Sequence, residues 1–444
     1  MKIKVGNYSV LNQGNECYLK IDIAIEFPDG QQTTFAKINV TDIGYFIGKV
    51  PMASTAFLYL SAIVYAIDRF VLREKNSIEG WSREFDVDFK LPEADMFSSC
   101  KNQIERLLSF LTGDYWNCSF YGCNTIDLPD FEENHYYDQV TQVNLFSGGM
   151  DSLIGAIDYM ALHSDGHVFL ASHYDKTMKG PKTDQRHLLQ HFNMQYPERY
   201  LSFLHGPVLI EPEVAVDATC RSRSLMFIAI ALQVAIYRNC GVVIPENGSV
   251  SLNYPLSPSR RTSCSTRTTH PIVLHRLRTL FESLGIMVSV INPYEFMTKG
   301  EMVQQCADRG FLLQVLSDSN SCGKRGRKQF FFDNSDATHC GRCMPCMYRR
   351  AALVGFPDHS TYGFTLEHLF ALSKKQISDD FYAMLHFLKQ DLSDEAISAE
   401  LRIAGMGQMP RFGDYVELVK KTRDELKTLI VEDGTPAILH YINL

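Results

Sequence analysis

The sequence has 444 residues, of which 45% are hydrophobic and 21% are charged, and its formal net charge is −8. This is the composition of a globular chain with two or three domains, and the negative charge argues against a nucleic-acid-binding protein, which needs clustered lysine and arginine. The apolar stretches are shorter than the roughly 18 residues of a membrane span, and the N-terminal MKIKVGNYSV lacks the apolar core of a signal peptide, so we expect a cytoplasmic protein.

Residues 1–140 predict an N-terminal α+β accessory domain. Strands are indicated by IKVGNYSV, YLKIDIAIEF, TTFAKINV and EFDVDFKLP, which are rich in β-branched and aromatic residues. Helices are indicated by MASTAFLYLSAIVYAIDRFVLREK and NQIERLLSFLTG. The acidic, turn-rich stretch DLPDFEENHYYDQ marks the boundary to the next domain.

Residues 141–360 alternate between short apolar runs and helical patterns, beginning with QVNLFS and SLIGAIDYMAL. Such alternation predicts an α/β domain with a doubly wound parallel sheet, whose ligands bind beyond the carboxyl ends of its strands. Residues 361–444 read as an amphipathic helical extension, which serves as a packing or interaction element.

A glycine turn, SGGMDS, connects the first strand of this domain to its helix. Gly148 and Gly149 allow positive φ and close approach of a ligand, and the N–H groups of the helix start suit phosphate. Ser147 and Ser152 add hydroxyl donors, while Asp151 either caps the helix or holds the magnesium ion of a nucleotide. The plainer interpretation is an ordinary capped turn between a strand and a helix.

A group of cysteines near the end of the domain has the spacing of a metal site. Cys340, Cys343 and Cys346 form a Cys-x-x-Cys-x-x-Cys run, and Cys322 precedes them. Four thiolates bind zinc tetrahedrally in closed structural sites. We expect structural zinc with Cys322 as the fourth ligand; His339 is the alternative ligand, and an iron–sulfur cluster is the alternative occupant.

The glycine turn and the cysteine motif together resemble the 7-cyano-7-deazaguanine synthase (QueC) family of PP-loop ATP pyrophosphatases, which have an adenine nucleotide alpha-hydrolase-like fold. The similarity runs from about Val143 to Phe356, or about half of the chain. The family's cysteine motif is matched by Cys322, Cys340, Gly341, Cys343, Cys346 and Arg349.

Other family positions match less completely. The stretch SHYDKTMKGPKTDQRH keeps Tyr174, Gln185, Arg186 and His187 but carries an insertion, and Arg223 is followed by serine where the family has asparagine. NPYEFMTKGEMV aligns Lys299 and Glu301. The segment IPENGSVSLNYPLSPSRRTSCSTRTTHP departs from the family's substrate loop, and both ends of the chain are additions. In these additions the chain is most similar to the extended QueC-like proteins of bacterial antiviral operons, in the Qat systems and type IV CBASS.

The resemblance implies a C–N bond-forming ligase. ATP would adenylate the carboxylate of 7-carboxy-7-deazaguanine or a similar 7-deazapurine, with Mg²⁺, and an amine would attack the acyl-adenylate. The acceptor is either ammonia, as in biosynthesis of the 7-cyano product, or an amine of a partner protein from the same operon. The added sequence at both ends favours the macromolecular partner. A tRNA-modifying PP-loop enzyme and a catalytically silent, zinc-stabilised scaffold are the competing interpretations.

Roles then follow for individual residues. The expected catalytic residues are Asp151, Lys299 and Arg223. The expected ATP-binding residues are Ser147, Gly148, Gly149, Asp151, Ser152, Tyr174 and Gln185. The expected substrate-binding residues are Glu246, Arg260, Arg267 and His270, and the expected metal ligands are Cys322, Cys340, Cys343 and Cys346. The plainer interpretations are a surface ion pair for Arg223, an exposed helix start for Lys299, a solvated turn for Glu246 and a solvated loop for Arg260, Arg267 and His270.

Overall fold

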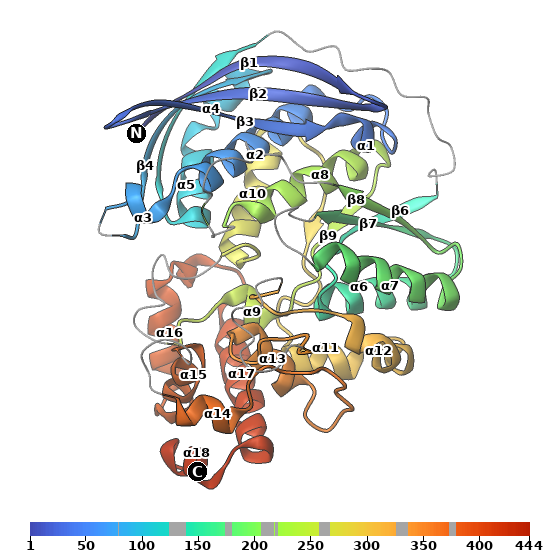
Figure 1. The fold of residues 1–444 in the computed structure, drawn as a ribbon, viewed down its shortest axis with the longest axis vertical. Coiled ribbons are helices and arrows are strands. Elements are labelled where there is room, and N and C mark those ends of the chain that lie inside the picture. The colour runs from blue at the N-terminus through green and yellow to red at the C-terminus, as the bar shows by residue number, and fades with distance from the viewer. Residues whose placement is uncertain are drawn as a thin grey trace.

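The computed structural model shows an α/β protein with two five-stranded sheets, one mixed and one parallel, and a layer of helices at the C-terminal end (Figure 1). The structure describes residues 1–78, 80–123, 139–173, 180–205, 217, 221–256, 267–325, 336–372 and 379–444. The predicted boundary at DLPDFEENHYYDQ lies almost entirely outside these residues.

The N-terminal sheet is mixed, with the strand order β3-β2-β1-β4-β5. β1 pairs with β2 and β2 with β3 antiparallel, whereas β4 is parallel to both β1 and β5. The strands are β1 (Lys2–Gln13), β2 (Glu16–Phe27), β3 (Gly30–Asn39), β4 (Glu84–Leu91) and β5 (Tyr115–Gly122). The alternating apolar residues of EFDVDFKL bury one face of β4, as the sequence predicts. β5 was not among the predicted strands, although YWNCSFYG alternates between apolar and polar residues much as EFDVDFKL does.

Helix α2 (Met52–Phe70) forms within the predicted helical stretch and is buried along nearly all of its length. It packs between the first sheet and α8 (Arg223–Tyr237), a helix that lies against the second sheet. A helix that is apolar all round is stable only when it is enclosed. The other helices of this part are α1 (Val40–Gly44), α3 (Arg73–Asn76), α4 (Ala94–Ser99) and α5 (Lys101–Thr112).

The second sheet is parallel throughout, with the order β10-β9-β6-β7-β8. The strands β7 and β8 therefore follow on one side of β6 and the strands β9 and β10 on the other, so the strand order reverses at β6. Its strands are β6 (Val140–Leu145), β7 (His167–His173), β8 (Tyr200–His205), β9 (Gly241–Val243) and β10 (Val290–Ile291). β10 is much shorter than the apolar run LGIMVSVINP suggested, because only these two residues pair with β9. The crevice at the reversal point is where open parallel sheets bind their ligands.

Helices cover both faces of the parallel sheet (Figure 1). One face carries α6 (Met150–Leu162) and α7 (Pro181–Gln195), and the other carries α8 and α10 (Pro271–Ser283). Shorter helices complete this part: α9 (Gly248–Leu252), α11 (Lys299–Gln305), α12 (Arg309–Val315) and the 3-10 turn η3 (Leu316–Asp318). One continuous apolar core joins the first sheet, α2, α8, α10 and the second sheet.

Residues 361–444 are helical in their described part, as predicted, and pack with α13 (Met344–Ala352) around a second apolar core. Their helices are α14 (Leu366–Ala371), α15 (Asp379–Lys389), α16 (Asp394–Ile403), η5 (Met406–Gln408), α17 (Phe412–Asp433) and α18 (Pro436–Tyr441). Within the described part of the chain, none of the helices combines the length and the apolar character needed to cross a membrane.

Candidate functional site

A polar pocket lies beside the start of α6 and the segment that follows β9, and its empty volume is about 860 Å³ including the open mouth. It lies at the edge of the sheet where β6 and β9 end, next to the reversal of strand order. Its lining includes eight of the residues singled out from the sequence: Ser147, Gly149, Asp151, Ser152, Arg223, Glu246, Lys299 and Cys322. The fold therefore gathers residues that are far apart in the chain into a single site.

The glycine turn forms the floor of this pocket. Gly148 has φ +83°, and α6 begins two residues later. The Ser152 hydroxyl donates to the carbonyl of Gly149 at 2.9 Å and lies 3.2 Å from the Ser147 hydroxyl. A Cβ at Gly148 would lie 3.2 Å from Cγ of Gln185, so glycine is needed here both for its backbone conformation and for space.

Asp151 is the centre of a buried polar cluster. Lys299 Nζ donates to its Oδ1 at 2.5 Å, and both side chains are less than 8% exposed. The backbone and side-chain N–H groups of Asn247 donate to Oδ2 at 3.2 and 2.6 Å. Asp151 thus links α6 to α11 and to the segment after β9, in addition to lining the pocket.

The pKa values of the Asp151 and Glu246 carboxyl groups are shifted in opposite directions. Burial alone would raise the pKa of Asp151, but the charge of Lys299 and the hydrogen bonds from Glu246, Lys299 and Asn247 hold it below its ordinary value. Burial and the charge of Asp151 raise the pKa of Glu246 well above its ordinary value. The Glu246 carboxyl group is therefore protonated more readily than an ordinary glutamate, and that of Asp151 less readily than an ordinary aspartate.

The side chain of Lys299 is held in place by its helix and by the C-terminal layer. Thr298 caps α11 in a reciprocal arrangement with Glu301, and Glu425 of α17 accepts the Gly300 N–H at 3.0 Å. Lys299 is only 3% exposed, so the interpretation as an exposed helix start is wrong. Its ammonium group is instead directed at the glycine turn.

Arg223 reaches the pocket from the first turn of α8. The preceding residue, Ser222, donates its N–H and its hydroxyl to Asp68 of α2 at 3.1 and 2.7 Å. The N-terminal layer therefore fixes the start of the helix that carries Arg223.

Four buried cysteines lie next to the pocket, and one of them, Cys322, also lines it. The four Sγ atoms of Cys322, Cys340, Cys343 and Cys346 all lie within 4.8 Å of one another, close to the ~3.8 Å spacing of sulfurs around one tetrahedral zinc ion. This donor set fits a single ion such as Zn²⁺.

His339 is not part of this group. Its Nδ1 lies 2.9 Å from the Thr338 hydroxyl, and the buried Nε2 has no hydrogen-bond partner among the described residues. The fourth sulfur of the cluster comes from Cys322, as the first interpretation has it.

Gln185 is fully buried and donates to the carbonyl of Ser147 at 3.2 Å, which places it against the glycine turn. Its neighbours Arg186 and His187 are exposed on the same helix and do not line the pocket. Tyr174 and Arg260 lie outside the described residues, so their predicted roles stay predictions.

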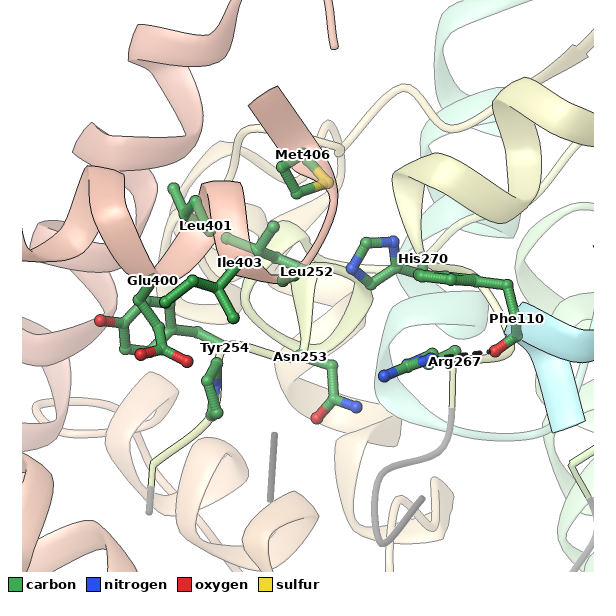
Figure 2. A pocket seen from close by; sticks show the side chains of 12 residues that line it. Phe110, Leu252, Asn253, Tyr254, Arg267, His270, Glu400, Leu401, Ile403 and Met406 are labelled. Atoms are coloured by element: carbon green, nitrogen blue, oxygen red, sulfur yellow. Dashed lines mark hydrogen bonds between the residues drawn. The ribbon is translucent and has the colours of Figure 1, made fainter. Parts of the chain in front are cut away.

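Arg267 and His270, expected to bind the substrate together with Glu246, lie in a different pocket, about 480 Å³ in empty volume (Figure 2). Figure 2 shows them with Phe110 at one end of this pocket, and Glu400 and Tyr254 at the other. The pocket is formed by α5, the end of α9, α16 and η5. Because α9 separates it from Glu246, the structure does not bring the three predicted substrate residues together.

The interpretation as a solvated loop is wrong for His270, which is buried, whereas Arg267 lies in an irregular segment and is half-buried. His270 is 4% exposed, and its Nδ1 accepts the Ile272 N–H at 3.2 Å. Burial and the charge of Arg267 lower the pKa of His270 to about 3, so the ring is neutral. The Arg267 guanidinium lies 4.4 Å from the centroid of the Phe110 ring and donates to the carbonyl of that residue.

Four further polar residues that line the first pocket are not marked by the sequence motifs: Asp184, Asn320, Ser321 and Arg325. The same is true of Asn247, which donates to Asp151. Ser321 and Arg325 flank Cys322 in NSCGKR, and the basic residues there were the one signal available from the sequence.

A scan against protein-family models, a search of curated proteins and a search of solved structures each found no match to this chain. The fold and the site by themselves define an α/β protein with a charged pocket at a glycine turn, next to four cysteines that can hold a metal ion such as zinc.

Proposed function

We propose that this protein is a PP-loop enzyme that adenylates a carboxylate with ATP and transfers the acyl group to an amine. The observation that carries the proposal is the convergence of the glycine turn, the Asp151–Lys299 pair and Arg223 in one pocket. The cysteine cluster beside the turn supports the resemblance to the 7-cyano-7-deazaguanine synthase family, whose substrate, 7-carboxy-7-deazaguanine, we take as the first candidate.

The pocket has the charges that a triphosphate needs. The backbone N–H groups at the start of α6 and the dipole of that helix favour an anion. Lys299 and Arg223 add positive charge from α11 and α8. The raised pKa of Glu246 favours its protonated form, which reduces the negative charge that faces the phosphates.

In the proposed reaction, a carboxylate oxygen of the substrate attacks the α-phosphorus of ATP. The bond from that phosphorus to the bridging oxygen breaks, and pyrophosphate leaves. The amine nitrogen then attacks the acyl carbon, AMP leaves with the bonding electrons, and the nitrogen loses a proton to water. Cations and N–H donors placed around the phosphates stabilise the charge that develops on phosphorus.

Asp151 and Glu246 offer the hard oxygen ligands that Mg²⁺ prefers, and a cation bound beside them would favour loss of the Glu246 proton. Mg²⁺ bound there would neutralise charge on the phosphate chain. Lys299 then stays the positively charged neighbour of the same carboxylate.

The test is mass spectrometry of the protein incubated with ATP, Mg²⁺ and 7-carboxy-7-deazaguanine, first with ammonia and then with the proteins encoded beside it. Asp151→Asn removes the charge at the centre of the cluster, and we expect turnover to fall by about a hundred-fold or more. Asp165→Asn is the matched control, because Asp165 is exposed beyond the end of α6.

A small amide or nitrile would identify ammonia as the acceptor, and a mass increase on a neighbouring protein would identify a protein amine. Both support the adenylation proposal. AMP and pyrophosphate formation that is equal in Asp151→Asn and in the wild type would contradict it. If no mixture consumes ATP, the interpretation as a silent scaffold replaces it.

A further inference from the structure

Arg325 enters the first pocket from the cysteine cluster. It lies three residues after Cys322, and its backbone N–H donates to the Cys322 carbonyl at 3.0 Å. Its side chain lines the same pocket as Ser147, Gly149 and Lys299. A turn that begins at a cysteine of the cluster therefore carries a positive charge to the glycine turn.

The segment that carries Arg325 is hydrogen-bonded directly to the glycine turn. The Asn320 N–H donates to the Gly148 carbonyl at 2.9 Å, and the Met150 N–H donates to the Ser321 hydroxyl at 3.2 Å. These two bonds fix the segment against the N–H groups at the start of α6. Arg325 thus has a defined place relative to the turn.

In the structure the Arg325 guanidinium is held by Asp184 on the first turn of α7. Its Nε and Nη2 donate to the two carboxylate oxygens at 2.9 and 2.7 Å. A guanidinium has five N–H donors, so three remain beyond this pair. At Gly180, a Cβ would lie 2.7 Å from Nε of Arg325, so glycine leaves room for the guanidinium at the start of α7.

The charges around the pocket favour a further anion. Lys299, Arg223 and Arg325 bring three basic side chains to the pocket, against the acidic side chains of Asp151, Asp184 and Glu246 in its lining, and the raised pKa of Glu246 favours its neutral form. A phosphate chain bound over the glycine turn would supply the missing negative charge, and a guanidinium matches phosphate oxygens in a two-bond geometry.

We propose that Arg325 binds the phosphate chain of the nucleotide, on the side of the pocket formed by the cysteine cluster. Asp184 positions the guanidinium in the free protein and limits its positive charge. This inference rests on the proposed function, since it names a further ligand of the ATP used there. It predicts that loss of the Arg325 charge weakens phosphate binding, whereas loss of the Asp184 charge does not.

The experiment measures equilibrium binding of ATP and of inorganic pyrophosphate to the metal-loaded full-length protein by calorimetry. Arg325→Gln should weaken binding of both by about ten-fold to a hundred-fold, the usual loss for charge-assisted hydrogen bonds. Asp184→Asn should leave binding unchanged or strengthen it. Arg342→Gln is the matched control, because Arg342 lies in the same cysteine motif but does not line the pocket.

The binding measurements distinguish a failure of the role proposed for Arg325 from a failure of the proposed function. If the wild type binds ATP and Arg325→Gln binds it equally well, the role of Arg325 is refuted while the proposed function stands. If Asp184→Asn weakens binding as much as Arg325→Gln, the ion pair is structural and the proposal also fails. If the wild type binds neither ATP nor pyrophosphate, the proposed function itself fails. Circular dichroism and metal content verify that each variant is folded.

Discussion

Lys299→Met tests the buried charge cluster most directly. The Lys299 and Asp151 side chains are 4% and 7% exposed and lie 2.5 Å apart. Removing the ammonium leaves the Asp151 carboxylate buried without its opposite charge, and breaking a buried pair in this way lowers the free energy of unfolding by about 3–5 kcal/mol.

Protonation of Asp151 sets an upper limit on that loss. An ordinary aspartate has a pKa near about 3.9, so keeping it protonated at pH 7 costs about 4 kcal/mol, at about 1.4 kcal/mol for each pH unit. At pH 5 the same protonation costs only about 1.5 kcal/mol. The variant adopts whichever state is less costly, so we expect a loss of about 3–4 kcal/mol at pH 7 and about 1.5 kcal/mol at pH 5.

The sign of this pH dependence follows from the two folded states. In the wild type the pKa of Asp151 is held below its ordinary value, so the contribution of Asp151 to stability is complete above about pH 4 and is lost only in stronger acid. In Lys299→Met, burial without the cation raises that pKa, so stability falls as the pH rises above about 4. The difference between the two proteins therefore grows with pH.

Urea denaturation followed by far-UV circular dichroism at pH 5 and pH 7 measures the effect. Lys101→Met is the control, because Lys101 is 41% exposed in its pair with Glu105 and should contribute less than about 1 kcal/mol at either pH. The double variant Asp151→Asn/Lys299→Met has neither buried charge and should recover much of the loss. An equal loss at both pH values would refute the reasoning.

Three further predictions concern neighbouring parts of the site. The raised pKa of Glu246 makes the folded protein bind an extra proton, so the wild type loses stability as the pH rises above about 4.5, by up to about 1.4 kcal/mol per pH unit. Glu246→Gln lacks this proton, so its melting temperature relative to the wild type should rise between pH 5 and pH 8, and a constant difference would contradict the assignment. Cys343→Ser should reduce the zinc bound to the purified protein to background by plasma mass spectrometry; unchanged zinc would exclude the cluster as the metal site. Gly148→Ala should cost about 1–2 kcal/mol in urea denaturation, because Gly148 has φ +83°, whereas Gly149→Ala should cost less, since Gly149 has a negative φ; equal losses would argue against the backbone explanation.

The local parts of the site could be predicted from the sequence. Adjacent glycines after an apolar strand give the turn at Gly148, and the regular spacing of the cysteines gives the cluster. Both patterns are set by residues close together in the chain. The alternation of strands and helices likewise predicted the parallel sheet, since each unit folds over a short segment.

The long-range parts could not be predicted. The Asp184–Arg325 pair joins residues 141 positions apart, and no local pattern marks either residue as a partner of the other. The burial of Lys299 depends on Glu425 and the rest of α17, which a reading of α11 alone does not reveal. Arg267 and His270 follow the segment after β9 in the sequence, but the fold turns them towards α5 and α16.

The two ends of the chain have a structural use that bears on the acceptor. Asp68 in α2 holds the start of α8 through Ser222, and Thr422 in α17 lies 2.6 Å from the Ser249 hydroxyl of α9. The N-terminal layer therefore supports the helix that carries Arg223, and the C-terminal layer supports α9 and α11.

Because both additions help to build the pocket, their presence is explained without a macromolecular partner. The length of the chain alone therefore no longer favours a protein amine over ammonia. Under the proposed function, the choice between ammonia and a protein amine depends on access to this pocket, to whose lining Arg223, Glu246 and Arg325 contribute from three different segments of the chain.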